Sequence, residues 1–281
     1  MKKRNEDGFT EAEFLANYHP GDYERPSVTV DMMILRMKED FSGLQILLIQ
    51  RKNHPFIENW ALPGGFINMD ESAYEAACRE LQEETGLTNI YLEQVYTMSQ
   101  PDRDPRMRVI DIAYAALLPY GNKHAVVAGD DAKNALWFDI SLTENSLSFY
   151  NEEQDICIQY NLEMKTFQNG RITITNKIPR KREIEADNEN HLAFDHADII
   201  LEGLRRFQNK VMYTDIAFNL VPAKFTLPDL QRVYEVLLGK SLYKANFRKL
   251  VHEKIIALNV TGKPIISQKP AMLYQYKEYL S

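Results

Sequence analysis

The sequence predicts an α+β protein built from two domains, and three observations support this. The chain has 281 residues, long for one small domain and ordinary for two. Strand-like apolar segments surround one strongly marked helix in the first 200 residues. Residues 1–200 carry 20 Lys and Arg against 34 Asp and Glu, a net charge of −14, whereas residues 201–281 carry 13 against 6, a net charge of +7. We expect domains at residues 1–207 and 208–281, with an anionic partner for the basic one.

The composition also bounds where the chain acts. No run of eighteen apolar residues is present, so we expect no membrane span. No apolar segment follows the basic start Met-Lys-Lys-Arg, so we expect no signal peptide and a cytoplasmic protein. The two cysteines, Cys78 and Cys157, form no disulfide framework and are expected to be buried thiols. The six histidines show no metal-ligand spacing.

The first expected elements are a short helix and a strand hairpin. The helix is expected at residues 10–18. Residues 27–37 form a nearly continuous apolar run, as in a strand buried on both faces. A turn at residues 39–43 leads to a second strand at residues 44–51. Two glycines, Gly64 and Gly65, then allow close backbone approach to a metal or phosphate.

The central helix has clear start and stop signals. Ser72 and Glu75 form a capping box, and Gly86 is a natural residue to end the helix. The small apolar stripe, at positions 73, 77 and 81, predicts close packing against a sheet.

Three carboxylates share one face of the last turn of this helix. Glu80, Glu83 and Glu84 repel one another and stand at the negative end of the helix dipole. Arg79 can relieve only part of this cost. A solvated acidic face is the simpler interpretation, but it leaves the placement at the C-terminal turn unexplained. Oxygen ligands of this kind suit Mg²⁺ or Mn²⁺, so we expect a divalent cation here.

This stretch resembles the Nudix box without any departure. The nine matching positions are Gly65, Glu71, Arg79, Glu80, Leu81, Glu83, Glu84, Gly86 and Leu87. The resemblance implies an α/β/α sandwich with a mixed sheet and hydrolysis of a nucleoside diphosphate derivative. It further implies that Glu80, Glu83 and Glu84, with the Gly65 carbonyl, hold the metal. Arg79 and Glu71 would orient the cluster.

A loop rich in arginine follows the next expected strand, at residues 90–98. Arg103, Arg106 and Arg108 lie in it, and an apolar strand at residues 109–118 comes after it. A stiff surface loop with local ion pairs is one interpretation. The other is a phosphate-binding wall, because guanidinium groups suit diphosphate oxygens. The loop resembles one in Nudix proteins that handle ADP-ribose-like compounds, which makes ADP-ribose the best substrate candidate.

The remaining N-terminal segments give weaker signals. Asp131, and next Asp130, are candidates for the general base, because several Nudix enzymes place theirs on a loop in this region; a plain turn is the alternative. A strand is expected at residues 134–139. A hairpin joins residues 153–164 to residues 171–178 around Asn169-Gly170. An amphipathic helix at residues 190–208 closes the domain.

The basic C-terminal segment has the pattern of a winged helix. Thr226 and Pro228 start a helix that Gly239 ends, and Ser241 is a candidate cap for the next helix. Strands at residues 255–260 and 271–277 follow as a wing. The second helix exposes four residues suited to DNA: Lys244, Asn246, Arg248 and Lys249. A dimerisation module is the alternative, and readers of palindromic DNA are usually homodimers.

The combination resembles the Nudix-related transcription regulators, in which a winged helix binds an operator. Many of these have lost box carboxylates, whereas this chain keeps them all. We therefore expect a Mg²⁺-dependent hydrolase acting on ADP-ribose, and as the alternative a DNA-binding regulator that senses ADP-ribose or a related nucleotide. Removal of oxidised nucleotides is less favoured, because nothing in the arginine loop indicates base recognition.

Overall fold

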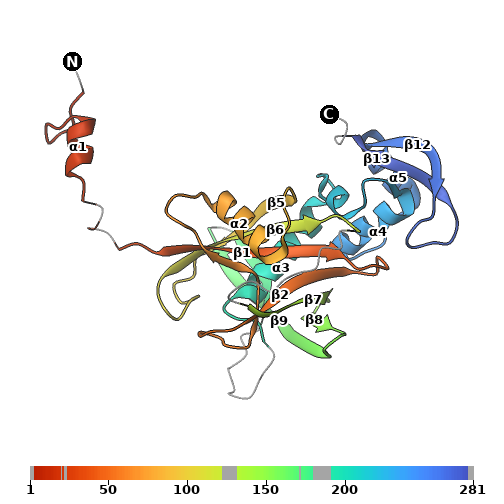
Figure 1. Ribbon diagram of the computed structural model, residues 1–281, viewed down its shortest axis with the longest axis horizontal. Helices are drawn as coiled ribbons and strands as arrows, with labels where there is room; N and C mark the ends of the chain where they lie inside the picture. Colours follow the sequence, from red (N-terminus) through yellow and green to blue (C-terminus); the bar gives the residue numbers. More distant parts are fainter. Residues whose placement is uncertain are drawn as a thin grey trace.

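One large mixed sheet forms the centre of the N-terminal domain (Figure 1). The computed structural model describes residues 3–19, 21, 24–121, 132–170, 172–179 and 191–277. The strand order is β10-β9-β8-β7-β2-β1-β6-β5, with β3 paired to β2 and β4 paired to β1. β1 and β6 run parallel, and β2 and β4 pair with β1 in the antiparallel sense. The strands are β1 (Ser27–Met37), β2 (Leu44–Arg51), β3 (Trp60–Ala61), β4 (Gly64–Phe66), β5 (Tyr91–Met98), β6 (Val109–Leu118), β7 (Ala132–Leu142), β8 (Ser146–Asn151), β9 (Ile156–Asn169) and β10 (Ile172–Pro179).

The sequence predicted most of these strands. β1, β2 and β6 have the expected bounds, and β5 begins one residue later than expected. The hairpin of β9 and β10 is confirmed. β7 is longer than expected, and β8 was missed because its pattern is short.

Two helices cover opposite faces of the sheet. On β1, Met32 and Ile34 belong to the core shared with α2 (Ala73–Thr85), whereas Met33 and Leu35 belong to the core shared with α3 (His196–Lys210). Alternate residues of a strand point to opposite faces, so the continuous apolar run of β1 follows from burial on both sides. The predicted α/β/α sandwich is confirmed.

α2 is the predicted central helix. The Ser72 hydroxyl accepts from the Glu75 backbone at 3.3 Å, and the Glu75 carboxylate accepts from the Ser72 backbone at 2.8 Å. Gly86 ends the helix in the left-handed conformation, with φ of 68°. The buried apolar residues are Ala76, Ala77 and Leu81, while Ala73 is half-buried.

α3 begins later than the sequence suggested. Residues 180–190 lie outside the described part of the chain, and the helix starts at His196 rather than at residue 190. Phe194 has φ of 53°, a left-handed conformation that a helix cannot continue through. The expected domain boundary after residue 207 falls in the last turn of α3.

The C-terminal domain is a winged helix, as predicted. Its helices α4 and α5 are followed by a wing, and β11 adds an unexpected third strand in the order β11-β13-β12. α5 begins after Tyr243, so the cap predicted at Ser241 is wrong. The elements are η2 (Ile216–Leu220), β11 (Phe225–Thr226), α4 (Leu227–Leu238), α5 (Lys244–Val251), η3 (His252–Lys254), β12 (Ile255–Gly262) and β13 (Ala271–Tyr276).

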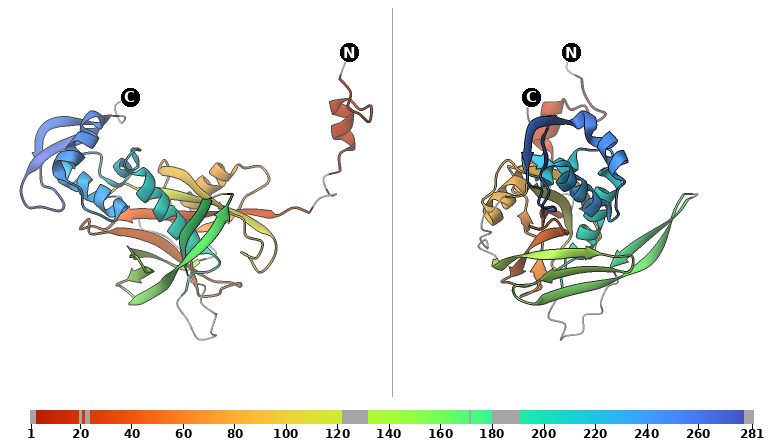
Figure 2. Two further views of the ribbon diagram at one scale, coloured as in Figure 1. Left: turned by 180° about the vertical axis from the view of Figure 1, so that it is seen from behind. Right: turned by 90° about the vertical axis from the view of Figure 1, so that its right-hand side faces the viewer.

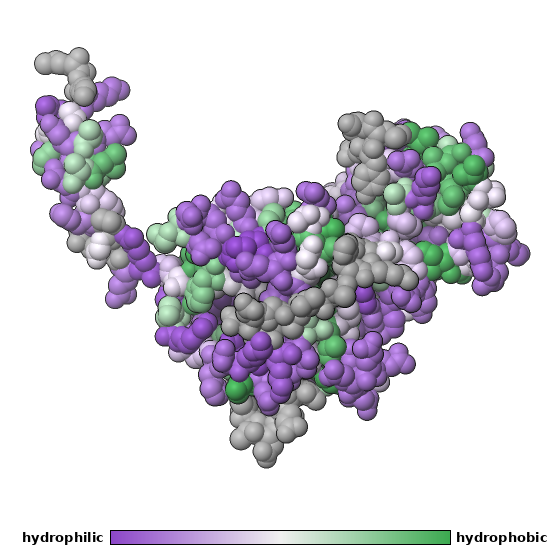
Figure 3. Space-filling model, in the orientation of Figure 1, coloured by the Kyte–Doolittle hydropathy of each residue, from purple (hydrophilic) through white to green (hydrophobic). Residues whose placement is uncertain are grey.

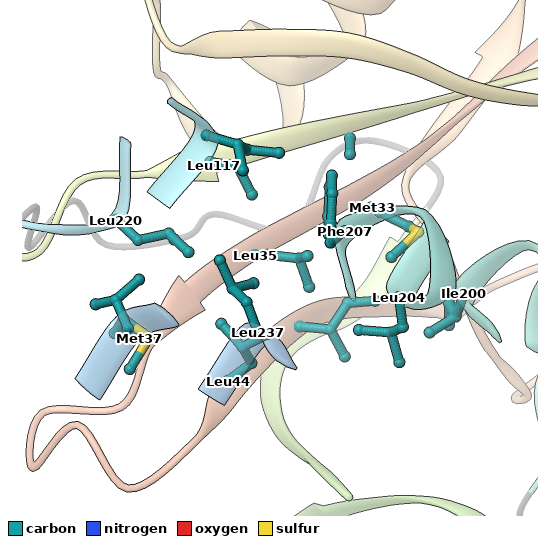
Figure 4. Close-up of a cluster of buried hydrophobic side chains, with 14 of the residues drawn as sticks. Met33, Leu35, Met37, Leu44, Leu117, Ile200, Leu204, Phe207, Leu220 and Leu237 are labelled. Atoms are coloured by element: carbon teal, nitrogen blue, oxygen red, sulfur yellow. The ribbon is translucent and has the colours of Figure 1, made fainter. Parts of the chain in front are cut away.

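A single hydrophobic core joins the two domains. Leu204 and Phe207 of α3 belong to the same cluster of buried side chains as Leu35 of β1 and Leu237 of α4 (Figure 4). Gly203 allows α3 to lie close to β1, because a Cβ atom there would lie 2.3 Å from the Met33 sulfur.

α1 (Glu11–Asn17) buries no residue and stands apart from the body of the chain (Figures 1 and 2). No helix within the described residues is long and apolar enough to cross a membrane. Both cysteines are exposed, so the expectation of buried thiols was wrong: each side chain points away from the core-facing side of its element.

Candidate functional site

The three glutamates of the box lie in the second half of α2, but their exposure differs. Glu80 and Glu84 are buried, while the Glu83 side chain is 57% exposed. The surface over α2 is mostly hydrophilic (Figure 3). The helix therefore places two carboxylates against the protein and one toward the solvent.

Arg79 connects these carboxylates to the loop before the helix. Its guanidinium group lies 2.8 Å from Glu71, 2.7 Å from Glu80 and 3.2 Å from Glu83. It also donates to the Phe66 carbonyl at 3.2 Å. The positioning role predicted for Arg79 and Glu71 has these contacts in its favour.

Two carboxylates of this cluster have opposite pKa shifts. The hydrogen bond from Arg79, helped by the Asn68 backbone N–H, lowers the pKa of Glu71 to about 2. Burial raises the pKa of Glu80 above its ordinary value, more than Arg79 lowers it. Glu80 therefore lacks sufficient positive charge around it.

A divalent cation fits this deficit. The Gly65 backbone lies against Glu80 so closely that a Cβ atom on Gly65 would meet Glu80 Oε1 at 2.3 Å. Carboxylate and carbonyl oxygens are the donors that Mg²⁺ and Mn²⁺ prefer. Within the described residues, no three His, Cys, Asp or Glu side chains converge as a metal site, and Glu80 and Glu83 are both hydrogen-bonded to Arg79.

Arg103 points into the protein rather than along the surface. Its side chain is 4% exposed and donates two hydrogen bonds to Asp195, at 2.7 and 3.0 Å. It also lies 3.4 Å from Asp31 on β1. These ion pairs are buried and distant in sequence, so they differ from the local surface pairs of the first interpretation, and substrate binding by Arg103 stays a prediction.

The other two arginines of the loop also have protein partners. Arg106 binds Asp104 through two hydrogen bonds, of 2.8 and 3.0 Å, and keeps 40% of its side chain exposed. Its guanidinium group lies 5.7 Å from the Phe66 ring centre. Arg108 donates to the carbonyls of Ser99 and Gln100, which braces the base of the loop. Of the three, Arg106 is best placed to meet a ligand beside the glutamates.

A buried polar cluster lies between the box and α3, and sequence reasoning missed it. Asp111 is fully buried next to Asp31; its Oδ1 accepts from the Thr29 hydroxyl at 3.0 Å, and no hydrogen-bond partner of its Oδ2 lies among the described residues. Burial, then the charge of Asp31, raise the pKa of Asp111 well above its ordinary value. Burial also acts against the charge of Asp31, but His196 and Arg103 outweigh it and lower the pKa of Asp31. The available signal was one acidic residue inside each of two apolar strands.

One predicted residue pair cannot be placed. Asp130 and Asp131, the candidates for the general base, lie outside the described residues.

The second candidate surface is on α5. Phe247 and Val251 are buried against the domain, so the opposite face of the helix is turned outward. The four predicted residues are all exposed: Lys244, Asn246, Arg248 and Lys249. Lys263 and Lys269, in the loop between β12 and β13, are exposed as well. The arrangement offers a basic helix and a basic wing to an anionic partner.

Comparisons with known proteins agree with this two-part architecture. Residues 25–155 match the NUDIX domain family, and residues 217–276 match the NrtR DNA-binding winged helix domain. The chain is 33% identical over 269 residues to the ADPR responsive transcriptional repressor NtrR of Acinetobacter baylyi, covering 95% of this chain and 88% of that one. The chain belongs to the NrtR family of Nudix-related regulators. 

Two further relatives represent the whole architecture and the Nudix part. The crystal structure of Shewanella oneidensis NrtR complexed with a 27mer DNA aligns with a TM-score of 0.59 at 28% identity, covering 89% of this chain and 93% of that one. The ADP-ribose pyrophosphatase of Methanocaldococcus jannaschii is 43% identical over 119 residues, covering 42% of this chain and 65% of that protein.

Proposed function

We propose that this protein is a transcription regulator that binds operator DNA through its winged helix and senses ADP-ribose or a related nucleoside diphosphate derivative through its Nudix domain. The observation that carries this is the similarity over nearly the whole chain to a repressor described as ADPR responsive. The sequence alone had favoured a hydrolase first. The full-length relative favours the regulator, because its similarity includes the basic domain that a hydrolase does not need.

The DNA-binding part rests on the exposed face of α5. Arg248 and Lys249 would contact phosphates, and Asn246 would contact an adenine edge. We further propose a homodimer acting in the cytoplasm on a palindromic operator, because two-fold DNA sites are matched by two-fold proteins.

A gel-shift experiment with and without ADP-ribose tests this function. The double variant Arg248→Ala/Lys249→Ala removes two phosphate contacts, which should weaken binding and reduce the salt slope by about 2. Lys133→Ala/Lys165→Ala removes the same charge from the Nudix domain, where both lysines are exposed, and should change neither quantity. Equal behaviour of the two double variants would exclude α5 as the DNA-binding helix, and a wild-type protein indifferent to ADP-ribose would exclude the sensor.

Hydrolysis is a second candidate function, favoured by the intact set of box carboxylates. Glu80, Glu83 and Glu84, with the Gly65 carbonyl, would hold Mg²⁺ or Mn²⁺. Bound there, the cation would neutralise diphosphate charge and lower the pKa of a coordinated water. Arg79 would release Glu83 toward the metal while keeping Glu71 in place. Arg106 would orient the diphosphate, and Asp131 remains the proposed base.

Phosphate release from ADP-ribose, measured after phosphatase treatment, tests this second function. With Mg²⁺ we expect turnover by the wild-type protein and its loss in Glu83→Gln. Glu75→Gln is the matched control, because it changes a carboxylate of the same helix and keeps a capping side chain. Unchanged turnover in Glu83→Gln would contradict a catalytic role for the box.

A further inference from the structure

α3 lies in a stretch that belongs to neither matched family region. Those regions end at residue 155 and resume at residue 217, whereas α3 spans His196–Lys210. Its 15 residues give a length of about 22 Å. One end of α3 contacts the residues around the glutamate site, and the other end packs on the winged helix. The helix therefore spans the two functional parts.

The first turn of α3 is fixed by an ion pair. Asp195 occupies the N-cap position, yet its side chain makes no capping hydrogen bond. Instead, both carboxylate oxygens accept from Arg103, at 2.7 and 3.0 Å. An N-cap aspartate normally stabilises its own helix. Here that carboxylate binds Arg103 of the arginine loop and does not cap the helix.

Two more contacts join the start of α3 to the segment at residues 60–65, which precedes α2 and contains Gly64 and Gly65. The Leu62 backbone N–H donates to His196 Nδ1 at 2.8 Å, so the ring faces Asp31 through Nε2, 3.4 Å away. The Ala193 backbone N–H donates to the Trp60 carbonyl at 2.8 Å. Leu62 is three residues before Gly65, the proposed metal-binding carbonyl. A displacement of the segment at residues 60–65 would therefore also displace the start of α3.

The other end of α3 carries the DNA-binding domain. Leu204 and Phe207 pack in one core with Leu237 of α4 (Figure 4). Arg232 of α4 donates to the Phe41 and Ser42 carbonyls at 2.9 and 2.8 Å. A cavity of about 390 Å³ lies along this seam, lined by residues of both domains. The seam therefore has room for α4 to move with α3.

A diphosphate ligand has a direct way to disturb the ion pair. Arg103 and Arg106 belong to one short loop, and Arg106 is partly exposed beside Phe66, next to the glutamates. Guanidinium groups bind phosphate through the same paired geometry that they use for carboxylates. A diphosphate drawn to Arg106 competes with Asp104 and displaces the loop that presents Arg103.

We propose that the Arg103–Asp195 ion pair couples the nucleotide site to the winged helix, with both residues acting as positioning residues for α3. The closed pair holds α3 and α4 in the arrangement that binds DNA. Nucleotide binding moves the loop, opens the pair and changes the affinity for DNA. This inference rests on the proposed function, since it names how the same site is regulated.

The test measures coupling rather than stability. DNA affinity is titrated with and without ADP-ribose, and ADP-ribose binding is measured separately by calorimetry. For the wild-type protein we expect ADP-ribose to change DNA affinity about tenfold, within the usual range of allosteric coupling. Asp195→Asn keeps the shape but weakens the pair. It should bind ADP-ribose within about threefold of wild type, while the effect on DNA affinity falls below about twofold.

Asp198→Asn is the matched control, because Asp198 is the acidic residue in the first turn of the same helix and both carboxylate partners of Arg103 remain in place. It should keep the wild-type response. If Asp195→Asn fails to fold, Asp195→Glu replaces it, since glutamate keeps the charge and its longer side chain loses the paired geometry.

Each outcome is decisive. An equal response in wild type and Asp195→Asn overturns the coupling role and leaves the sensor function intact. Loss of ADP-ribose binding in Asp195→Asn also overturns it, since the residue would then act at the ligand site. A wild-type protein that ignores ADP-ribose removes the proposed function and the inference together.

Discussion

Two arginines of the Nudix domain organise carboxylates in different surroundings. Arg79 contacts Glu71, Glu80 and Glu83 with a side chain that is 29% exposed. Arg103 contacts Asp195 and Asp31 with a side chain that is 4% exposed. Water can solvate part of the Arg79 guanidinium group, and a metal ion can take its place as the partner of the carboxylates. Water has little access to the partners of Arg103, so the first cluster can change its state at little cost, whereas the second changes only when ligand binding supplies the free energy.

The largest expected effect is that of Arg103→Ala. The substitution leaves Asp31 and Asp195 without their guanidinium partner, and breaking a buried ion pair costs about 3–5 kcal/mol. Urea unfolding measures the loss in the free energy of unfolding. Arg79→Ala, measured in parallel, should cost about 1 kcal/mol, because the Arg79 side chain is 29% exposed and water can occupy the position that its guanidinium group leaves. Similar losses for the two variants would contradict the contrast between the clusters.

Asp111→Asn should have a smaller effect on the free energy of unfolding, and this effect should depend on pH. The raised pKa of Asp111 means that the folded protein binds a proton that the unfolded chain releases. Stability should therefore fall as pH rises from the ordinary pKa near 3.8 toward the raised folded value, by at most about 1.4 kcal/mol per pH unit. Asparagine keeps nearly the same side-chain shape and has no carboxyl group that titrates.

Urea unfolding across pH 5 to 9 measures this difference. The Asp111→Asn variant should lose less stability than wild type as pH rises, so that the gap in its favour widens. Parallel pH profiles would show that Asp111 is ionised in the folded state, against the assignment made here.

The smallest expected effect is the stabilisation by Mg²⁺ of the carboxylate cluster around Arg79. In Arg79→Ala, Glu71, Glu80 and Glu83 lose the cation that separates them, so Mg²⁺ should stabilise this variant more than it stabilises wild type. The melting temperature with millimolar Mg²⁺ and with a chelator measures this. A Mg²⁺ response no larger than that of wild type would mean that the glutamates hold no cation without Arg79.

The same two clusters show what the sequence could predict. The partners of Arg79 are 8, 1 and 4 residues away, so helix periodicity and one loop bring them together. The partners of Arg103 are 72 and 92 residues away. Their contact depends on the order of strands and on the start of α3, neither of which a local pattern contains. Arg103 was therefore assigned to phosphate binding, with no means of identifying Asp195.

The start of α3 was also missed, whereas the winged helix was predicted. The apolar pattern around Ile199 and Leu204 predicted α3, but the left-handed Phe194 that precedes it gave no sequence signal. The winged helix was predicted because its caps, Thr226 and Gly239, act within a few residues. Its exposed residues on α5 followed from the burial of Phe247, which helical spacing could predict.

The shared core around Leu237 has a consequence for how such a chain can be divided. The chain contains two regions that match separate families. The apolar face of α4, in the second region, is nevertheless covered by α3 and by β1 of the first region. A winged helix separated from the rest would expose that face to water, and the Nudix domain would lose part of its own interior. Although the two parts match separate families, we expect the shared core to couple their stabilities, so that the chain unfolds in a single transition.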